Sequence, residues 1–155
     1  MSKVIGRGRY VGHTYPERSG GEEGVLQNHA EYVAGAISTP AATLTFDTPN
    51  FTTRTGKVRV TVGMNPLGAG GSAVDNDVVT FKVRQDAAAL GSGSPIFQTT
   101  MTGTTPATAA NLTYEITDLE PGSTHTFGVQ AVDSTSNHTM TLAAGGAFVL
   151  IEDIL

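Results

Sequence analysis

From Ala41 to the last residue, apolar and polar side chains alternate in short segments separated by turn-forming residues, and this pattern restricts the possible folds most strongly. In "KVRVTVGM" (57–64), apolar residues take every second position, which places them on one face of a β-strand. The segments of this kind are 42–46, 57–64, 77–84, 95–102, 111–117, 123–131, 138–143 and 146–154. These eight segments, rich in threonine and β-branched residues, predict an all-β fold, either an eight-stranded jelly roll or a β-sandwich.

Residues 1–40 lack this alternation. The stretch "GRGRYVGHTYPERSGGEEG" (6–24) is rich in glycine and turn formers, which predicts an extended N-terminal arm. A short helical turn is expected in "VLQNHAEYVAGA", because the following residues fall at near-helical spacing: Val25, Leu26, His29, Tyr32 and Val33. We therefore divide the chain into an arm, 1–40, and a folded domain, 41–155.

Charge is distributed unevenly between these two parts. Residues 1–18 carry a net charge of +3, whereas the remainder of the chain carries −8, within an overall net charge of −5. A basic arm on an acidic body indicates that the arm meets a surface different from the one the body presents to solvent. Nucleic acid is a poor candidate for that surface, because the body is acidic and aromatic residues make up only 6% of the chain.

Several features argue against secretion, membrane insertion and thiol chemistry. Cysteine is absent, so the fold has no disulfides and no cysteine-based metal site. The first residues, "MSKVIGRGRY", lack the apolar run of a secretory signal, and no stretch approaches the roughly 18 apolar residues that span a bilayer. We expect a soluble protein made in a cytoplasm.

The residues that usually carry catalysis do not form a recognisable motif. The four histidines lack the spacing of a zinc site and lie outside any nucleophile elbow: His13, His29, His125 and His138. Asp75 and Asp77 lie in a loop without the spacing of a calcium-binding EF-hand. Glu152 and Asp153 are adjacent on a predicted strand, so their side chains point to opposite faces. We expect a protein that is not an enzyme and that holds no metal or cofactor.

The last segment, "GGAFVLIEDIL", is apolar on both faces. Ala147, Val149 and Ile151 point one way, while Phe148 and Leu150 point the other. A large side chain left in water forfeits about 1.5–3 kcal/mol of burial, so a second surface is expected to cover this face. Another part of the chain, such as the arm, or another copy of the chain could supply this surface. Another copy is the preferred candidate, and the predicted subunit contacts are Phe148, Leu150 and Ile154.

The order of these segments resembles a known class of viral proteins. The runs "TGKVRVTVGM", "DVVTFKVRQD", "LTYEITDLEPGSTHTFGVQAVDS" and "GGAFVLIEDIL" are similar to the small jelly-roll modules of tailed-bacteriophage structural proteins. Such modules have the shape of tumour-necrosis-factor-like heads, are usually trimers and often end in Glu-Asp-Ile, as this chain does at 152–154. The resemblance covers residues 41–155 and implies a homotrimeric virion protein.

Within that class, the preferred role is a capsid decoration (cement) protein on the capsid exterior, made in the host cytoplasm. The arm would then dock on the major capsid protein, with these residues as the expected contacts: Val4, Ile5, Arg7, Arg9, Tyr10 and Tyr15. The first alternative is a tail- or head-fibre tip that binds a host receptor.

A second alternative is a fibronectin-III-like binding module. It rests on the corner "LEPGSTHTFGVQA" (119–131), in which His125 stands where the corner tyrosine usually lies. The chain also lacks a tryptophan that would fill the core of such a domain.

Overall fold

The computed structural model describes residues 3–4, 10–15, 27–68, 77–102, 105–106, 109–134 and 139–155, and side chains within 28–68, 78–100, 109–134 and 139–155. Across these ranges the chain is all-β and contains no helix. The same residues accordingly include no helix long and apolar enough to cross a membrane. The fold class predicted from alternation is confirmed at this level.

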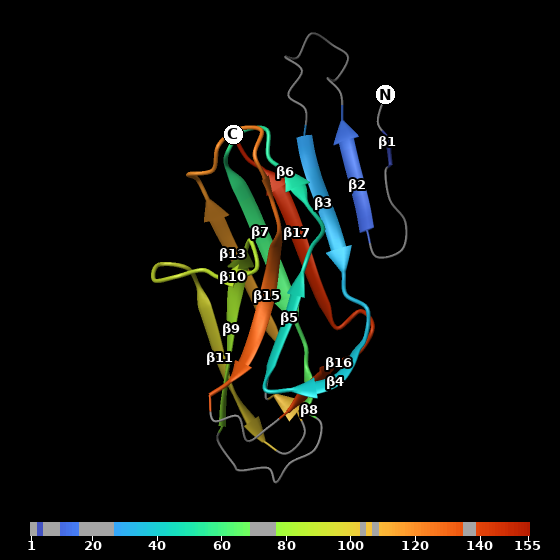
Figure 1. Cartoon of the computed structure of the whole chain (residues 1–155), viewed down its shortest axis with the longest axis vertical. Coiled ribbons are helices and arrows are strands. Elements are labelled where there is room, and N and C mark those ends of the chain that lie inside the picture. The colour runs from blue at the N-terminus through green and yellow to red at the C-terminus, as the bar shows by residue number, and fades with distance from the viewer. Residues whose placement is uncertain are drawn as a thin grey trace.

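Two larger antiparallel sheets dominate the structure (Figure 1). The β17 sheet has the order β1 (Lys3–Val4), β2 (Tyr10–Tyr15), β3 (Gln27–Val33), β17 (Ala147–Asp153), β7 (Val58–Met64), β13 (Ala110–Ile116). The β15 sheet has the order β12 (Thr105–Pro106), β11 (Ile96–Thr102), β9 (Asp77–Gln85), β15 (Phe127–Asp133), β5 (Thr43–Asp47), with β10 (Ala88–Ala89) paired to β9.

Two small sheets lie beside them. One pairs β4 (Ile37–Ala41) and β8 (Leu67–Gly68) with β16 (Met140–Leu142), and the other pairs β6 (Phe51–Thr52) with β14 (Thr124–His125). Each of the eight segments identified by alternation overlaps a strand of the structure, with ends that differ by at most a few residues. The local pattern therefore located these strands correctly.

The core lies between the two larger sheets. The alternate residues of β7, Val58, Val60 and Val62, are fully buried, and so are Phe81 on β9 and Val129 on β15. Residues from both sheets belong to one hydrophobic cluster. Successive residues of a strand point to opposite faces, so each sheet turns its apolar side inward and its other side outward.

Successive long strands mostly belong to opposite sheets, so the chain passes repeatedly from one sheet to the other. The strands β3, β7, β13 and β17 belong to one sheet, and β5, β9, β11 and β15 belong to the other. Of these eight strands, only β9 and β11 follow one another in the same sheet; β2 is added to the β17 sheet beyond β3. The last long strand, β17, lies between β3 and β7, so the two ends of this strand series pair with each other.

The expected helical turn within residues 25–36 is wrong for the residues that the structure describes. Gln27–Val33 is strand β3, which pairs with β17 from His29 to Val33. Ala30 and Tyr32 are buried, as a period of two requires. The spacing fitted both a helix and a strand, and pairing with β17 decided between them. Residues 27–41 are thus strands of the sheets or the short connections between them, and do not form an arm separate from the body.

The corner at 119–123 packs against a second tight turn at 53–56. Leu119 N donates to Gly56 O at 3.1 Å, Gly122 N donates to Thr53 O at 2.8 Å, and Thr53 N donates to Ser123 O at 3.0 Å. Gly56 has a φ of 77°, and a Cβ there would overlap the carbonyl oxygen of Leu119. Glycine is therefore required at 56 for the two turns to meet. After these paired turns the chain continues into β15, which lies between β9 and β5 in its sheet.

Candidate functional site: the outer face of the β17 sheet

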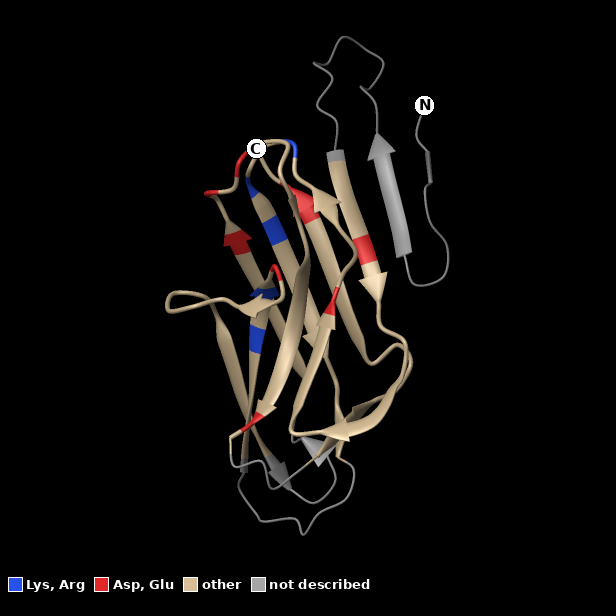
Figure 2. Ribbon diagram, in the orientation of Figure 1, with Lys and Arg blue, Asp and Glu red and all other residues tan. Residues whose placement is uncertain are grey.

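The outer face of the β17 sheet contains the predicted subunit contacts. Residues directly opposite one another on neighbouring strands point to the same face of a sheet. The strand register therefore shows which side chains form a row across this outer face. The apolar strip consists of Val33, Phe148 and Leu150. The charged row consists of His29, Arg59, Glu115 and Glu152. The charged residues of β7, β13 and β17 lie toward the end of the sheet nearest the carboxyl terminus (Figure 2).

Phe148 is half-buried within its own chain. It lies opposite Val33 on β3 and Gly63 on β7, and a Cβ at Gly63 would overlap the Phe148 ring. The missing side chain at 63 thus provides space for the ring. A glycine within a strand often marks such a close approach, and this was the one signal in the sequence that indicated it.

Leu150 is also half-buried, with Glu31 opposite on β3 and Thr61 opposite on β7. Neither Phe148 nor Leu150 is among the exposed large apolar residues of the described chain, which are Leu67, Ile96 and Leu155. The second face of β17 is therefore partly covered within the chain itself, and β3, one of the two flanking strands, comes from residues 1–40. The neighbouring strands cover part of it, and a half-buried apolar strip remains.

The charged row begins with a surface ion pair. Arg59 donates from Nε and Nη2 to Glu115 Oε1, at 3.0 and 2.7 Å, and both side chains are nearly half exposed. The hydrogen bond to Glu115 and the negative charge of that residue raise the pKa of Arg59. Beside this pair is an open hollow of about 180 Å³, lined by Asn28, His29, Arg59, Glu152, Asp153 and Ile154. Ile154, the third predicted subunit contact, thus lies at the charged end of the face.

Asp153 has a role that the sequence did not indicate. Its carboxylate accepts hydrogen bonds from Asn28 Nδ2 at 2.8 Å, Thr53 Oγ1 at 2.6 Å and Arg54 N at 2.9 Å. It therefore ties the end of β17 to β3 and to the turn at 53–56. A carboxylate with three donors is satisfied locally, so Asp153 is a structural anchor.

The predicted docking residues of the arm cannot be placed as side chains. Val4, Tyr10 and Tyr15 belong to β1 and β2, for which only backbone pairing is described, and Tyr10 pairs with Tyr32. The remaining three, Ile5, Arg7 and Arg9, lie outside the described residues. The contact of these residues with a partner stays a prediction.

The other residues singled out by their chemistry are dispersed. Asp75 and His138 lie outside the described residues, and the side chains of His13 and Asp77 are not described. His29 lines the hollow, whereas His125 lies on β14. Within the described part of the chain, no group of three or more histidine, aspartate or glutamate side chains is placed to hold a metal ion.

Comparison with family models and with curated proteins finds no match for this chain. Its function must therefore be inferred from the strand order and from the chemistry of its surfaces.

Proposed function

We propose that this chain is a structural protein of a tailed-bacteriophage virion, with a jelly-roll body that associates as a homotrimer. The observation that carries the proposal is the strand order. Apart from β1 and β2, which lie beyond β3, and the short strands β10 and β12, the orders β3-β17-β7-β13 and β11-β9-β15-β5 place four strands in each of two facing sheets, and the first and last of these eight, β3 and β17, are adjacent. A double-sheet jelly roll distributes eight strands in this way, as two Greek keys.

The same order argues against a fibronectin-III-like module. In immunoglobulin-like sandwiches the last strand pairs with the strand before it, in the C-F-G sheet. Here β17 pairs with β3 and β7, while β15 lies in the other sheet between β5 and β9. The likeness of residues 119–131 to a fibronectin corner therefore reflects a Pro-Gly turn that leads into a buried strand.

The apolar strip is the surface on which the trimer is proposed. Its side chains are half-buried, and the charged row borders it on one side, an arrangement of apolar centre and polar rim found in many subunit contacts. Because the sheet covers part of the strip, the expected contact is modest. Phe148, Leu150 and Ile154 would form it.

Within the virion class, we favour capsid decoration. The basic arm, through Val4, Ile5, Arg7, Arg9, Tyr10 and Tyr15, would dock on the major capsid protein at the capsid exterior, after synthesis in the host cytoplasm. The strands β1 and β2 of this segment already pair within the β17 sheet, so docking would use a segment whose backbone is in part ordered beforehand. A trimer presents three arms at once, so a weak contact at each arm gives a stronger overall attachment.

The deciding experiment is co-sedimentation of the full chain with undecorated capsids. We expect binding by the natural chain and a large loss of binding for Arg7→Ser/Arg9→Ser. The matched control is Arg54→Ser/Lys57→Ser, which removes two cations from exposed positions on the body. Equal loss in both variants would mean that general charge, and not the arm, drives attachment. Binding to host cells with no binding to capsids would instead support a fibre tip.

The trimer is tested separately by sedimentation equilibrium. Leu150→Glu introduces a charge into the apolar strip and is expected to yield single copies. Thr45→Glu introduces the same charge at an exposed position of β5, on the other sheet, and is expected to leave the mass unchanged. A natural chain that stays a single copy at micromolar concentration would overturn the trimer.

A further inference from the structure

Three polar side chains from two distant segments form a continuous hydrogen-bonded chain away from the β17 sheet surface. His125 Nε2 lies 2.8 Å from Ser123 Oγ, and His125 Nδ1 lies 2.7 Å from Asp86 Oδ2. Ser123 and His125 are two residues apart in an extended segment, which places them on the same side of the backbone. Asp86 comes from the turn between β9 and β10.

The turn that presents Asp86 has an unusual backbone. Asp86 and Ala87 have φ values of 50° and 63°, and Gln85 and Ala88 on either side of them are paired. A two-residue hairpin turn with both φ values positive is usually made by glycine or asparagine, and alanine is disfavoured there. Strained positions of this kind cluster at functional sites, where the surrounding contacts hold them.

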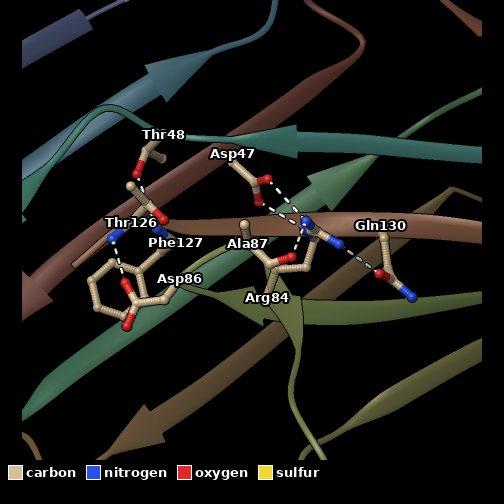
Figure 3. A network of polar contacts seen from close by, with 8 residues as sticks. All are labelled: Asp47, Thr48, Arg84, Asp86, Ala87, Thr126, Phe127 and Gln130. Carbon is tan, nitrogen blue, oxygen red and sulfur yellow. Dashed lines mark hydrogen bonds and ion pairs between the residues drawn. The ribbon is translucent and has the colours of Figure 1, made fainter.

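Hydrogen bonds with Thr126, the residue before β15, and with Arg84 on β9 hold the turn in place (Figure 3). Asp86 N donates to Thr126 O at 2.9 Å, and Thr126 N donates to Asp86 Oδ1 at 3.1 Å. Arg84 Nη2 donates to Ala87 O at 2.6 Å. One carboxylate oxygen of Asp86 is therefore fixed by the backbone, and the other is directed at His125.

The imidazole is enclosed, whereas the carboxylate is accessible. The His125 side chain is 18% exposed and that of Asp86 is 51% exposed. The ring of Phe127 packs 6.2 Å from the imidazole, centroid to centroid. Among the described residues, Asp86 is the charged group that contacts His125. A hydroxyl, an imidazole and an orienting carboxylate in this order are the parts of an activated serine nucleophile.

The position of the serine hydrogen controls this activation. Ser123 Oγ also lies 2.6 Å from Glu120 O, so its single hydrogen has two possible acceptors. When the hydroxyl donates to Glu120 O, His125 Nε2 must carry its own proton to bond Ser123, and the ring is then a cation. When Nε2 is deprotonated, it can accept the serine hydrogen and act as a general base.

The backbone around Ser123 limits what can follow. Gly122 N donates to Thr53 O at 2.8 Å, and Ser123 N donates to Glu120 O at 2.9 Å. Both N–H groups are therefore engaged, and neither can stabilise the oxyanion of a tetrahedral intermediate. This favours a single transfer to the serine over repeated turnover.

We propose that Ser123 is a nucleophilic modification site that takes an acyl or phosphonyl group from a small activated ester. Ser123 Oγ forms a bond to the carbonyl carbon or phosphorus atom while its proton passes to His125 Nε2. The bond to the leaving group then breaks, and His125 returns the proton to the departing group. The transferred group remains on Ser123, and no oxidant or reductant takes part. This site is independent of the proposed virion role.

The test is covalent labelling of the full chain with an alkyl fluorophosphonate, read by peptide mass spectrometry. Ser94 is an internal control, because its Oγ donates to Gly91 O at 2.8 Å in a turn, while its partners in the described chain include no histidine. We expect Ser123 to be labelled at least about tenfold faster than Ser94, since a positioned base contributes roughly 10²–10⁴ in favourable sites.

Two variants distinguish a positioned base from an exposed hydroxyl. His125→Gln is expected to reduce labelling of Ser123 to the rate of Ser94, with an unchanged rate at Ser94 as the check that the reagent acts equally on both chains. Asp86→Asn is expected to reduce it partially, because the imidazole loses its orienting charge. Equal labelling of Ser123 and Ser94 in the natural chain would overturn the proposal, and so would Ser123 labelling unchanged by His125→Gln. With p-nitrophenyl acetate we expect a burst of about one equivalent, and sustained turnover that depends on Ser123 would contradict the single-transfer assignment.

Discussion

On the outer face of each of the two larger sheets, a glycine leaves space for a side chain of a neighbouring strand. That side chain is apolar on one sheet and charged on the other. On the β17 sheet, Gly63 leaves space that the ring of Phe148 occupies. On the β15 sheet, Gly128 lies between Asp47 on β5 and Arg84 on β9, and a Cβ there would overlap the Asp47 carboxylate. In each case a glycine on a paired strand lets a neighbouring side chain reach across it.

The two faces differ in whether their groups are satisfied within the chain. Arg84 donates to both oxygens of Asp47, at 2.8 and 3.1 Å, to Gln130 Oε1 at 2.8 Å and to Ala87 O at 2.6 Å (Figure 3). This network is closed and needs no partner. The apolar strip around Phe148 is only half-buried, so it gains from further burial. The apolar strip of the β17 sheet is therefore one surface on which a partner would bring a gain; on the outer face of the β15 sheet, Ile96 at the start of β11 is 54% exposed.

The largest loss of folding stability is expected for Gly128→Ala. The new Cβ would overlap the backbone oxygen of Phe46 as well as the Asp47 carboxylate, so β5 must move away from β15. We expect the free energy of unfolding to fall by about 3 kcal/mol in urea titrations, at the upper end of the range for overpacking. Gly91→Ala is the matched control, because a Cβ there meets no atom within 4 Å. A loss smaller than that of Gly63→Ala would refute the comparison.

The next effect is expected for Arg84→Gln. It leaves Asp47, Gln130 and the Ala87 carbonyl without their shared donor at a site where the Arg84 side chain is only 12% exposed. Unpaired acceptors in such a site cost about 2 kcal/mol of unfolding free energy. Lys82→Gln removes the same charge two residues away on the same face and should change stability by less than about 0.5 kcal/mol. Equal losses in the two variants would show that the network contributes nothing specific.

A smaller effect is expected for Gly63→Ala. The overlap there is with the Phe148 ring, a side chain that can rotate outward. We expect a loss of about 1 kcal/mol. In the double variant Gly63→Ala/Phe148→Ala, the ring is absent, so the glycine substitution should cost nothing more. Additive losses in this double-mutant cycle would mean that ring and glycine do not interact.

The smallest effect is expected for Asp86→Asn, and it depends on pH. Burial of Asp86 raises its pKa, but hydrogen bonds from His125 and from Thr126 N outweigh this and lower it below 3.8. A lowered pKa in the folded state stabilises the fold above the unfolded pKa, and this stabilisation is lost as pH falls through the folded value. The difference in unfolding free energy between the natural chain and the variant should therefore shrink below about pH 4. Asp118→Asn, at an exposed position, provides the charge-matched comparison. If the difference in unfolding free energy increased as the pH fell, the predicted direction of the pH dependence would be wrong.

The strands were predictable because alternation is a local property. Val58, Val60 and Val62 share a face in any extended segment, and all three are buried. Residues 27–33 were not predictable in the same way, because their apolar positions suited two periods. Their pairing with β17, more than a hundred residues away, selected the strand.

The candidate surface was only half predictable. The sequence placed Phe148 and Leu150 on the second face of the last strand, and the structure agrees. It could not place Gly63 beneath Phe148, because the register between two strands is not encoded within either of them. For the same reason, Asp153 was recognised as a carboxylate but not as the anchor of three segments.

Composition and periodicity alone thus established an all-β chain without disulfides, the positions of most long strands and the side of each that faces the core. Folding in three dimensions determined which strands are neighbours, which outward side chains are covered, and that Asp86 meets His125. The physical reason is that side-chain direction repeats along a strand, whereas hydrogen-bond pairing joins segments that are far apart in the chain and equally able, by backbone chemistry, to pair elsewhere.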